Sequence, residues 1–223
     1  MHTPSPAHLL VLALLAPSCG PAPDDDGDDA TTTDATGDAG LDGPAEALAL
    51  VESEAGTYEG SWELYGLDGA DQPLVFVTWT DVAVATDPVL LADRAQLSVV
   101  DTMDYGGGQT GVQAWVEGVL LGADQGVGPR FIEVEGALTE FVELEPDHYT
   151  YETAITPAEL GLFANVTDAN LLEGHHTTDK QVSRPDGVET HTITRTTTLT
   201  YDAGEGPKQL EFVSLRGSHR KVP

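Results

Sequence analysis

The sequence predicts an all-β domain formed by one antiparallel barrel, with a β-sandwich as the alternative architecture. From residue 57 onward, apolar and polar residues alternate with a period of two, as in strands that bury one face. Val, Thr and aromatic residues, which favour strands, are frequent in these stretches. Short segments rich in Gly, Pro and Asp separate the stretches and supply turns. Together these observations predict eight or nine antiparallel strands and two short helices.

The expected elements follow in order along the chain. Residues 44–55 favour a short helix, because helix-forming residues follow a proline and Gly56 ends the run. Strands are expected over 57–66, 74–85, 95–103, 112–121, 130–144, 148–155, 171–183, 188–201 and 209–220. A second short helix is expected over 157–163, where Thr156 and Glu159 have the spacing of a capping box.

The glycine-rich segment Gly106–Gly111 contains the G-x-G-x-x-G spacing of dinucleotide-binding loops. That motif requires a tight turn from a strand into a helix within alternating β and α units. Here it joins two predicted strands, so we interpret it as a hairpin turn. The sequence predicts no bound cofactor and no catalytic residue, because no hydrolase, metalloprotease or phosphate-binding motif occurs.

The charge of the chain is strongly negative and unevenly distributed. The 223 residues include 9 Lys and Arg against 38 Asp and Glu, a net charge of −29. Only Arg94 and Arg130 are basic before residue 171, whereas the later residues carry equal numbers of acids and bases. This charge would repel a phosphate backbone, so it excludes a nucleic-acid partner.

The N-terminal segment has the features of an export signal. The apolar run Leu9–Leu15 has the length of a signal-peptide core and is too short to span a bilayer. The small residues Ala16 and Ser18 precede Cys19, the sole cysteine. This arrangement resembles the lipobox of bacterial lipoproteins, in which the cysteine is lipidated after cleavage. The resemblance implies a membrane anchor at Cys19 in the bacterial cell envelope, on the outer membrane or facing the periplasm; an ordinary secretory leader is the alternative.

Three segments of different character follow from this interpretation. Residues 1–18 are the predicted lipoprotein signal peptide. Residues 19–44 form an acidic tether with one large apolar residue, a composition that favours disorder. Residues 45–223 are the predicted single β-rich domain.

One motif of the domain resembles a known family. A short helix precedes Gly60-Ser61-Trp62, which is similar to the Gly-x-Trp of lipocalin-like (calycin) barrels. In that family the Trp packs at the closed end of the barrel against an Arg of the last strand. The resemblance implies a structural plug formed by Trp62 with Arg216 or Arg220, and a barrel that binds a small, partly apolar ligand.

The last three predicted strands place several polar residues on one face of the sheet. We estimate the register of these strands from their two turns. This register pairs Lys180 with His191, His176 with Arg195, and His191 with His219. These five residues are the candidate ligand-binding site, for an anion or a polar ligand. A metal site of the three histidines and a row of solvated side chains are the alternatives, and we predict no metal.

The favoured function is a non-catalytic envelope lipoprotein that binds a small ligand or a protein partner. An envelope enzyme that uses the His and Arg face, and a purely structural surface protein, are the alternatives.

Overall fold

The computed structural model describes residues 43–223, so the predicted signal peptide, Cys19 and most of the acidic tether lie outside the described residues. Helix α1 (Gly43–Glu54) precedes the strands. The strands are β1 (Gly56–Leu67), β2 (Pro73–Leu90), β3 (Arg94–Gly106), β4 (Gln109–Leu121), β5 (Val127–Val134), β6 (Ala137–Glu140), β7 (Val142–Glu145), β8 (His148–Ala154), β9 (Leu171–Ser183), β10 (Thr190–Asp202) and β11 (Pro207–Lys221). Two 3₁₀ helices, η1 (Glu159–Leu162) and η2 (Pro185–Gly187), lie in connections.

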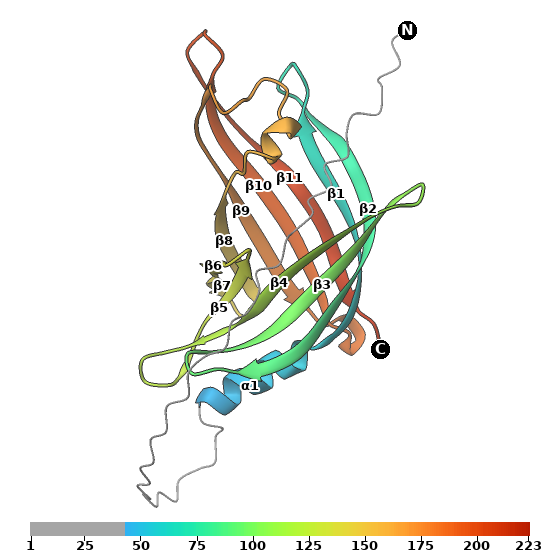
Figure 1. Ribbon diagram of the computed structural model, residues 1–223, viewed down its shortest axis with the longest axis vertical. Helices are drawn as coiled ribbons and strands as arrows, with labels where there is room; N and C mark the ends of the chain where they lie inside the picture. The colour runs from blue at the N-terminus through green and yellow to red at the C-terminus, as the bar shows by residue number, and fades with distance from the viewer. Residues whose placement is uncertain (1–42) are drawn as a thin grey trace, which may run out of the picture. The chain divides into compact units, whose positions relative to one another are not determined.

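All eleven strands belong to one antiparallel sheet that is nearly closed into a barrel (Figure 1). The sheet order is β6-β5-β4-β3-β2-β1-β11-β10-β9-β8-β7. The two strands at its ends, β6 and β7, are consecutive in the chain and are separated by Phe141 alone. The N–H of Phe141 donates to the carbonyl oxygen of Arg130 in β5 at 2.8 Å. The sheet must therefore curl until its ends meet, which confirms the predicted all-β barrel.

The strand count differs from the prediction because one expected strand is divided. The segment expected as a single strand over 130–144 forms β5, β6 and β7. Glu135 and Gly136 both have positive φ, 53° and 81°, and form a two-residue hairpin turn between β5 and β6. Phe141 then separates β6 from β7, and its buried ring stacks on Tyr151 with centroids 4.6 Å apart.

The expected helix over 157–163 is shorter than predicted. Half of the predicted capping box forms, since Thr156 donates to the Glu159 carboxylate from its N–H at 2.9 Å, whereas its hydroxyl donates to the same carboxylate instead of capping a helix N–H. Only the four residues of η1 follow, and Phe163 leaves the turn in extended conformation. The Phe163 ring is buried edge-on against Phe212, so packing into the barrel ends the helix.

Two apolar clusters occupy the inside of the barrel. Helix α1 packs against β2, β3, β4 and β5 and closes one end (Figure 1). The first cluster joins the buried face of α1 to the strands and consists of Ala47, Val51, Tyr58, Ala83, Ala85, Ala95, Leu97, Val99 and Val119. The second cluster, near η1, consists of Leu67, Leu160, Phe163, Val166, Leu199, Tyr201 and Phe212. Along β9, β10 and β11, several inward positions carry polar residues instead, and these form the candidate site.

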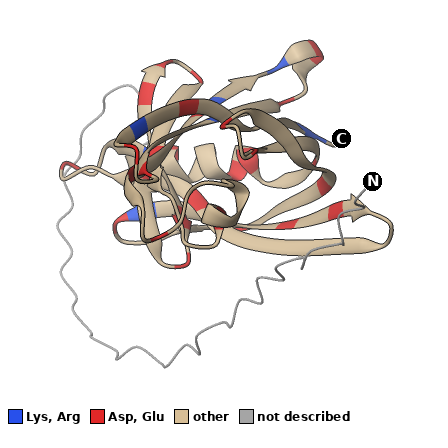
Figure 2. Ribbon diagram, turned by 90° about the horizontal axis from the view of Figure 1, so that it is seen from above, with Lys and Arg blue, Asp and Glu red and all other residues tan. Residues whose placement is uncertain are grey.

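Among residues 43–223 only three acids, Asp81, Asp101 and Glu189, are almost completely buried, and Figure 2 shows the acidic positions spread around the strands and turns with few Lys or Arg among them. Within residues 43–223, no helix combines the length and apolar character needed to cross a bilayer.

Candidate functional site

All five residues predicted for the ligand site lie on one face of the sheet, and that face is the inside of the barrel. The side chains of His176 and Lys180 are almost completely buried, and His219 is 8% exposed. His191 and Arg195 are mostly buried, with side chains 14% and 19% exposed. The common face was predicted from strand alternation, whereas the structure shows that it is enclosed rather than solvated.

The predicted register of the last two hairpins is partly wrong. His191 pairs with His219 as predicted. In the pairing of β10 with β9, however, Lys180 lies opposite Ile193 instead of His191, and His176 lies opposite Thr197 instead of Arg195. The connection through η2 is longer than the tight turn that was expected, so the register shifts by two residues. A shift of two keeps every side chain on its face, which is why the grouping survives.

Lys180 forms a buried ion pair with a carboxylate across the barrel. Its Nζ donates to Oε2 of Glu117 in β4 at 2.8 Å, and the indole N–H of Trp115 donates to Oε1 of the same carboxylate at 2.8 Å. Burial by itself raises the pKa of Glu117, but the charge and hydrogen bond of Lys180 outweigh it and lower that pKa to about 2. Glu117 is therefore a buried anion whose charge is matched by Lys180.

Glu159 of η1 contacts two other predicted residues. Its Oε1 lies 3.2 Å from Nη1 of Arg195 and 3.2 Å from Nε2 of His176. The other ring nitrogen of His176 is 2.7 Å from the hydroxyl of Thr197. Burial raises the pKa of Glu159, but the contact with His176 and the hydrogen bond from Thr156 lower it overall to about 2. The capping residue of η1 thus also ties the helix to β9 and β10.

Glu189 forms a third buried contact near α1. Its carboxylate accepts a hydrogen bond from the hydroxyl of Tyr58 at 2.8 Å and lies 3.0 Å from Nε2 of His191. Burial raises the pKa of Glu189, but the contacts with His191 and Tyr58 bring it down to about 2. Burial, followed by the nearby charge of Lys180, lowers the pKa of His191.

The fifth residue, His219, belongs to a separate cluster with two aspartates. Its Nε2 lies 2.9 Å from Oδ1 of Asp81 in β2. Asp101 in β3 is close to both, and Oδ1 of Asp101 has no hydrogen-bond partner among the described residues. Burial, and then the charge of Asp81, raise the pKa of Asp101 to about 7. The three histidines face different carboxylates, so the structure does not gather them around one point.

The free space inside this part of the barrel is small. A void of about 40 Å³ lies among Tyr58, Leu97, Trp115, Glu117 and His219, together with neighbouring side chains. Such a volume holds about one water molecule. The predicted basic residues are already in contact with carboxylates, so this void has room for a water-sized group and the side chains around it offer no unpaired Lys or Arg.

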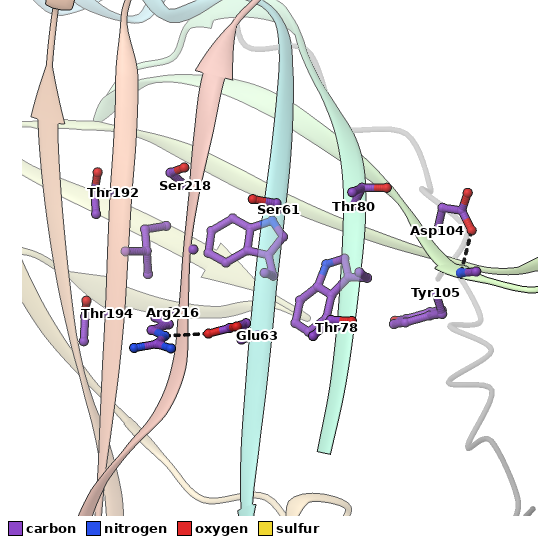
Figure 3. A pocket seen from close by; sticks show the side chains of 15 residues that line it. Ser61, Glu63, Thr78, Thr80, Asp104, Tyr105, Thr192, Thr194, Arg216 and Ser218 are labelled. Carbon is purple, nitrogen blue, oxygen red and sulfur yellow. Dashed lines mark hydrogen bonds and ion pairs between the residues drawn. The ribbon is translucent and has the colours of Figure 1, made fainter. Parts of the chain in front are cut away.

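A much larger hollow, of about 850 Å³, lies on the outside of the sheet (Figure 3). Most of the side chains that line it belong to two rows that run across neighbouring strands. The first row is Thr192, Ser218, Ser61, Thr80 and Asp104, from β10, β11, β1, β2 and β3. The second row is Thr194, Arg216, Glu63 and Thr78. We call these two rows the hydroxyl rows; they alternate with inward residues such as Trp62, which places them on the outer face.

Only one ion pair lies within the hydroxyl rows. Nε of Arg216 donates to Oε2 of Glu63 at 2.6 Å, and its guanidinium lies 5.2 Å from the ring centre of Tyr65. This pair is drawn as a dashed line in Figure 3. The remaining lining is largely neutral and rich in hydroxyl groups.

Trp62 and the two candidate plug arginines do not meet in the described structure. Trp62 points inward, where its ring lies edge-on to His219 at 4.8 Å and is stacked with Trp79 at 6.2 Å. Arg216 points outward to Glu63 because the two are paired in register on the opposite face, and Arg220 is exposed. The aromatic partner of Trp62 on the last strand is therefore a histidine.

Comparison with known proteins gives no match: no protein-family model, no curated protein and no solved structure is significantly similar to the chain. The site is therefore interpreted from its own residues.

The sequence prediction missed the carboxylates that partner the basic residues. These are Asp81, Asp101, Glu117, Glu159 and Glu189. Three of them, Asp81, Asp101 and Glu117, could have been recognised from the sequence, because each occupies an inward position in a strand whose other inward residues are mostly apolar. Asp101 follows Leu97 and Val99, for example, and Glu117 stands between Trp115 and Val119. A charged residue in an inward position indicates a buried partner.

Proposed function

We propose that this protein is a non-catalytic lipoprotein of the bacterial envelope that holds a partner on the outer face of its barrel. The observation that carries the proposal is the contrast between the two hollows. The inner void of about 40 Å³ is surrounded by paired charges, whereas the outer hollow of about 850 Å³ presents unused hydroxyl groups. The lipobox-like sequence before Cys19 and the acidic segment after it support an anchored, tethered domain.

The chemistry of the outer hollow favours a neutral, hydroxyl-rich chain, such as a neutral polysaccharide. The hydroxyl rows cross five strands that are about 4.8 Å apart, so they offer hydrogen-bonding groups along an extended line. Glu63 and Arg216 neutralise each other there, and Asp104 leaves the rows with one net negative charge, so they offer nothing to attract an anion. The net charge of −29 would also repel a polyanion.

We further propose that the domain is related to lipocalin-like barrels. Helix α1 followed by Gly60-Ser61-Trp62 at the start of the barrel supports this relationship. A barrel filled with ion pairs would then be a variant of that architecture in which binding has moved from the inside to the outside.

Binding should be lost when the hydroxyl groups are removed without changing the shape of the strands. The variant Ser61→Ala/Thr80→Val/Ser218→Ala deletes three hydroxyls of the first row. Because a hydrogen bond contributes about 1 kcal/mol and about 1.4 kcal/mol is tenfold in affinity, we expect binding of a neutral polysaccharide to weaken at least about tenfold. Isothermal titration calorimetry against a neutral glucan series and an acidic polysaccharide measures this change.

The matched control is Thr196→Val/Thr198→Val, which removes two outward hydroxyls of β10 beyond the hollow and should leave binding unchanged. Equal affinity of the wild type and the triple variant, or no binding of any neutral polysaccharide by the wild type, would contradict the proposal.

The membrane anchor is tested separately by Cys19→Ala. Removing the only thiol prevents lipidation, so the full chain expressed in bacteria should move from the membrane fraction to the soluble fraction. Immunoblotting of the two fractions checks this, with Thr31→Ser, which leaves the cysteine and the lipobox-like sequence unchanged, as control. A Cys19→Ala protein that still sediments with membranes would show that another feature attaches the chain.

A further inference from the structure

Three buried side chains from neighbouring strands converge inside the barrel, beside Trp62. Gly60 of β1 is paired with Asp81 of β2 on one side and with His219 of β11 on the other. Asp101 of β3 completes the group. All three of these polar residues are more than nine-tenths buried, with exposures of 5%, 5% and 8% for Asp81, Asp101 and His219.

The ligating atoms of the three side chains are close enough to share one ion. One atom from each residue can be chosen so that all three lie within 4.8 Å of one another. Nε2 of His219 and Oδ1 of Asp81 are 2.9 Å apart. Protein ligands bind Zn²⁺ from about 2.0 to 2.2 Å, which places ligands of one ion roughly 3 to 3.5 Å apart. Small side-chain rotations would therefore bring the three atoms onto a common ion.

The cluster holds a polar atom that nothing in the described chain satisfies. Oδ1 of Asp101 is buried and has no hydrogen-bond partner. Within residues 43–223, neither aspartate forms an ion pair with a Lys or Arg, and His219 is the basic group beside them. A buried carboxylate oxygen without a donor is costly, and buried charges are ordinarily paired or coordinate a metal. This arrangement differs from Glu117 and Glu159 in the same barrel, which have Lys180 and Arg195 as partners.

Gly60 provides the space in which the group meets. A Cβ atom at this position would lie 2.2 Å from Oδ1 of Asp81 and 2.4 Å from Cδ2 of His219. Any side chain at Gly60 would therefore push the aspartate and the histidine apart. The glycine lets both side chains turn toward the same point above β1.

We propose that Asp81, Asp101 and His219 form a binding site for one divalent transition-metal ion. Two carboxylate oxygens and one imidazole nitrogen suit Zn²⁺ or Mn²⁺, because the imidazole disfavours Ca²⁺ and Mg²⁺. Two carboxylates balance the double positive charge of the ion, so the loaded site is neutral. The void of about 40 Å³ that His219 also lines has room for a water molecule as a further ligand. The ion would join β2, β3 and β11 across the paired strand β1.

The first test measures bound metal in the untagged full-length chain. Wild type, Asp101→Asn and Asp93→Asn proteins are stripped with EDTA, dialysed against Zn²⁺ or Mn²⁺ and then against metal-free buffer, and analysed by inductively coupled plasma mass spectrometry. Asp93 is an exposed turn residue, so its replacement controls for the loss of one carboxylate. We expect about one more ion per chain in the wild type and in Asp93→Asn than in Asp101→Asn. Weak binding by the acidic N-terminal segment is common to all three proteins and cancels in this difference.

The second test uses thermal unfolding, because an ion that binds only the folded chain raises its melting temperature. Zn²⁺ or Mn²⁺ should raise the melting temperature of the wild type by several degrees, and EDTA should reverse the rise. Asp101→Asn keeps the shape of the side chain, so it should fold and yet show no metal-dependent shift. Equal metal content in the wild type and Asp101→Asn, together with equal melting temperatures with metal and with EDTA, would overturn the proposal and leave a buried proton as the sole partner of the two aspartates.

Discussion

Replacing Lys180 with methionine is expected to lower the free energy of unfolding by about 3 to 5 kcal/mol. The methionine would fill most of the volume of the lysine, so little of this loss would come from packing. The loss arises because the Glu117 carboxylate would stay buried in β4 without the cation that lies 2.8 Å from it in the wild type. Urea unfolding at pH 7, followed by circular dichroism, measures the difference.

The double variant Lys180→Met/Glu117→Leu should recover most of that stability. Two apolar side chains of similar volume avoid both the unpaired charge and the cost of removing two ions from water. Lys208→Met is the control, since Lys208 is a 44% exposed surface residue whose ion pairs contribute little. A single variant as stable as the wild type, or a double variant as unstable as the single, would show that the buried pair does not have this role.

Acid is expected to unfold the barrel below about pH 4.5. Contacts inside the barrel lower the pKa values of Glu117, Glu159 and Glu189 from 4.5 to about 2. A carboxyl group with a lowered pKa in the folded state stabilises the fold above its unfolded pKa, and this contribution disappears as the pH falls toward the folded pKa. The window of loss is therefore about pH 4.5 to 2. For Glu117, paired with the buried Lys180, the contribution is on the order of 3 kcal/mol, and Glu159 and Glu189 add contributions of the same sign.

Urea midpoints measured at intervals from pH 7 to pH 3 would reveal this loss. The Lys180→Met/Glu117→Leu protein lacks one of the three carboxyl groups, so its stability should decline less steeply over the same range. Parallel declines in the wild type and the double variant would assign acid sensitivity to other groups, such as the many exposed aspartates.

The strands could be predicted from the sequence because strand alternation is a local property. The predicted range 171–183 coincides with β9, and 57–66 differs from β1 by one residue at each end. The segment over 130–144 was harder, because Gly136 stands within a pattern that otherwise resembles one long strand. Its hairpin turn depends on a positive φ at Glu135, which side-chain type alone does not reveal.

The face of the candidate site was also predictable, whereas its electrostatic partners were not. His176, Lys180 and Arg195 share the inward side through alternation within β9 and β10. The carboxylates that neutralise them come from β4 and η1, which reach these residues only after the sheet has curled around. Contacts across the centre of a barrel depend on how the sheet closes. The register of neighbouring strands within one meander does not say which residues of distant strands will face each other after closure.

The pairing of β1 with β11 imposes an order on the folding of this chain. Tyr58 meets Lys221, so the first strand remains without one of its two neighbours until the last strand has formed. Contacts between residues this far apart in sequence form slowly, because a long loop must close before they can contribute. During this interval β1 exposes an unpaired edge that could pair with another chain. The yield of refolded protein should therefore fall as the protein concentration during refolding rises, even if the finished barrel is stable.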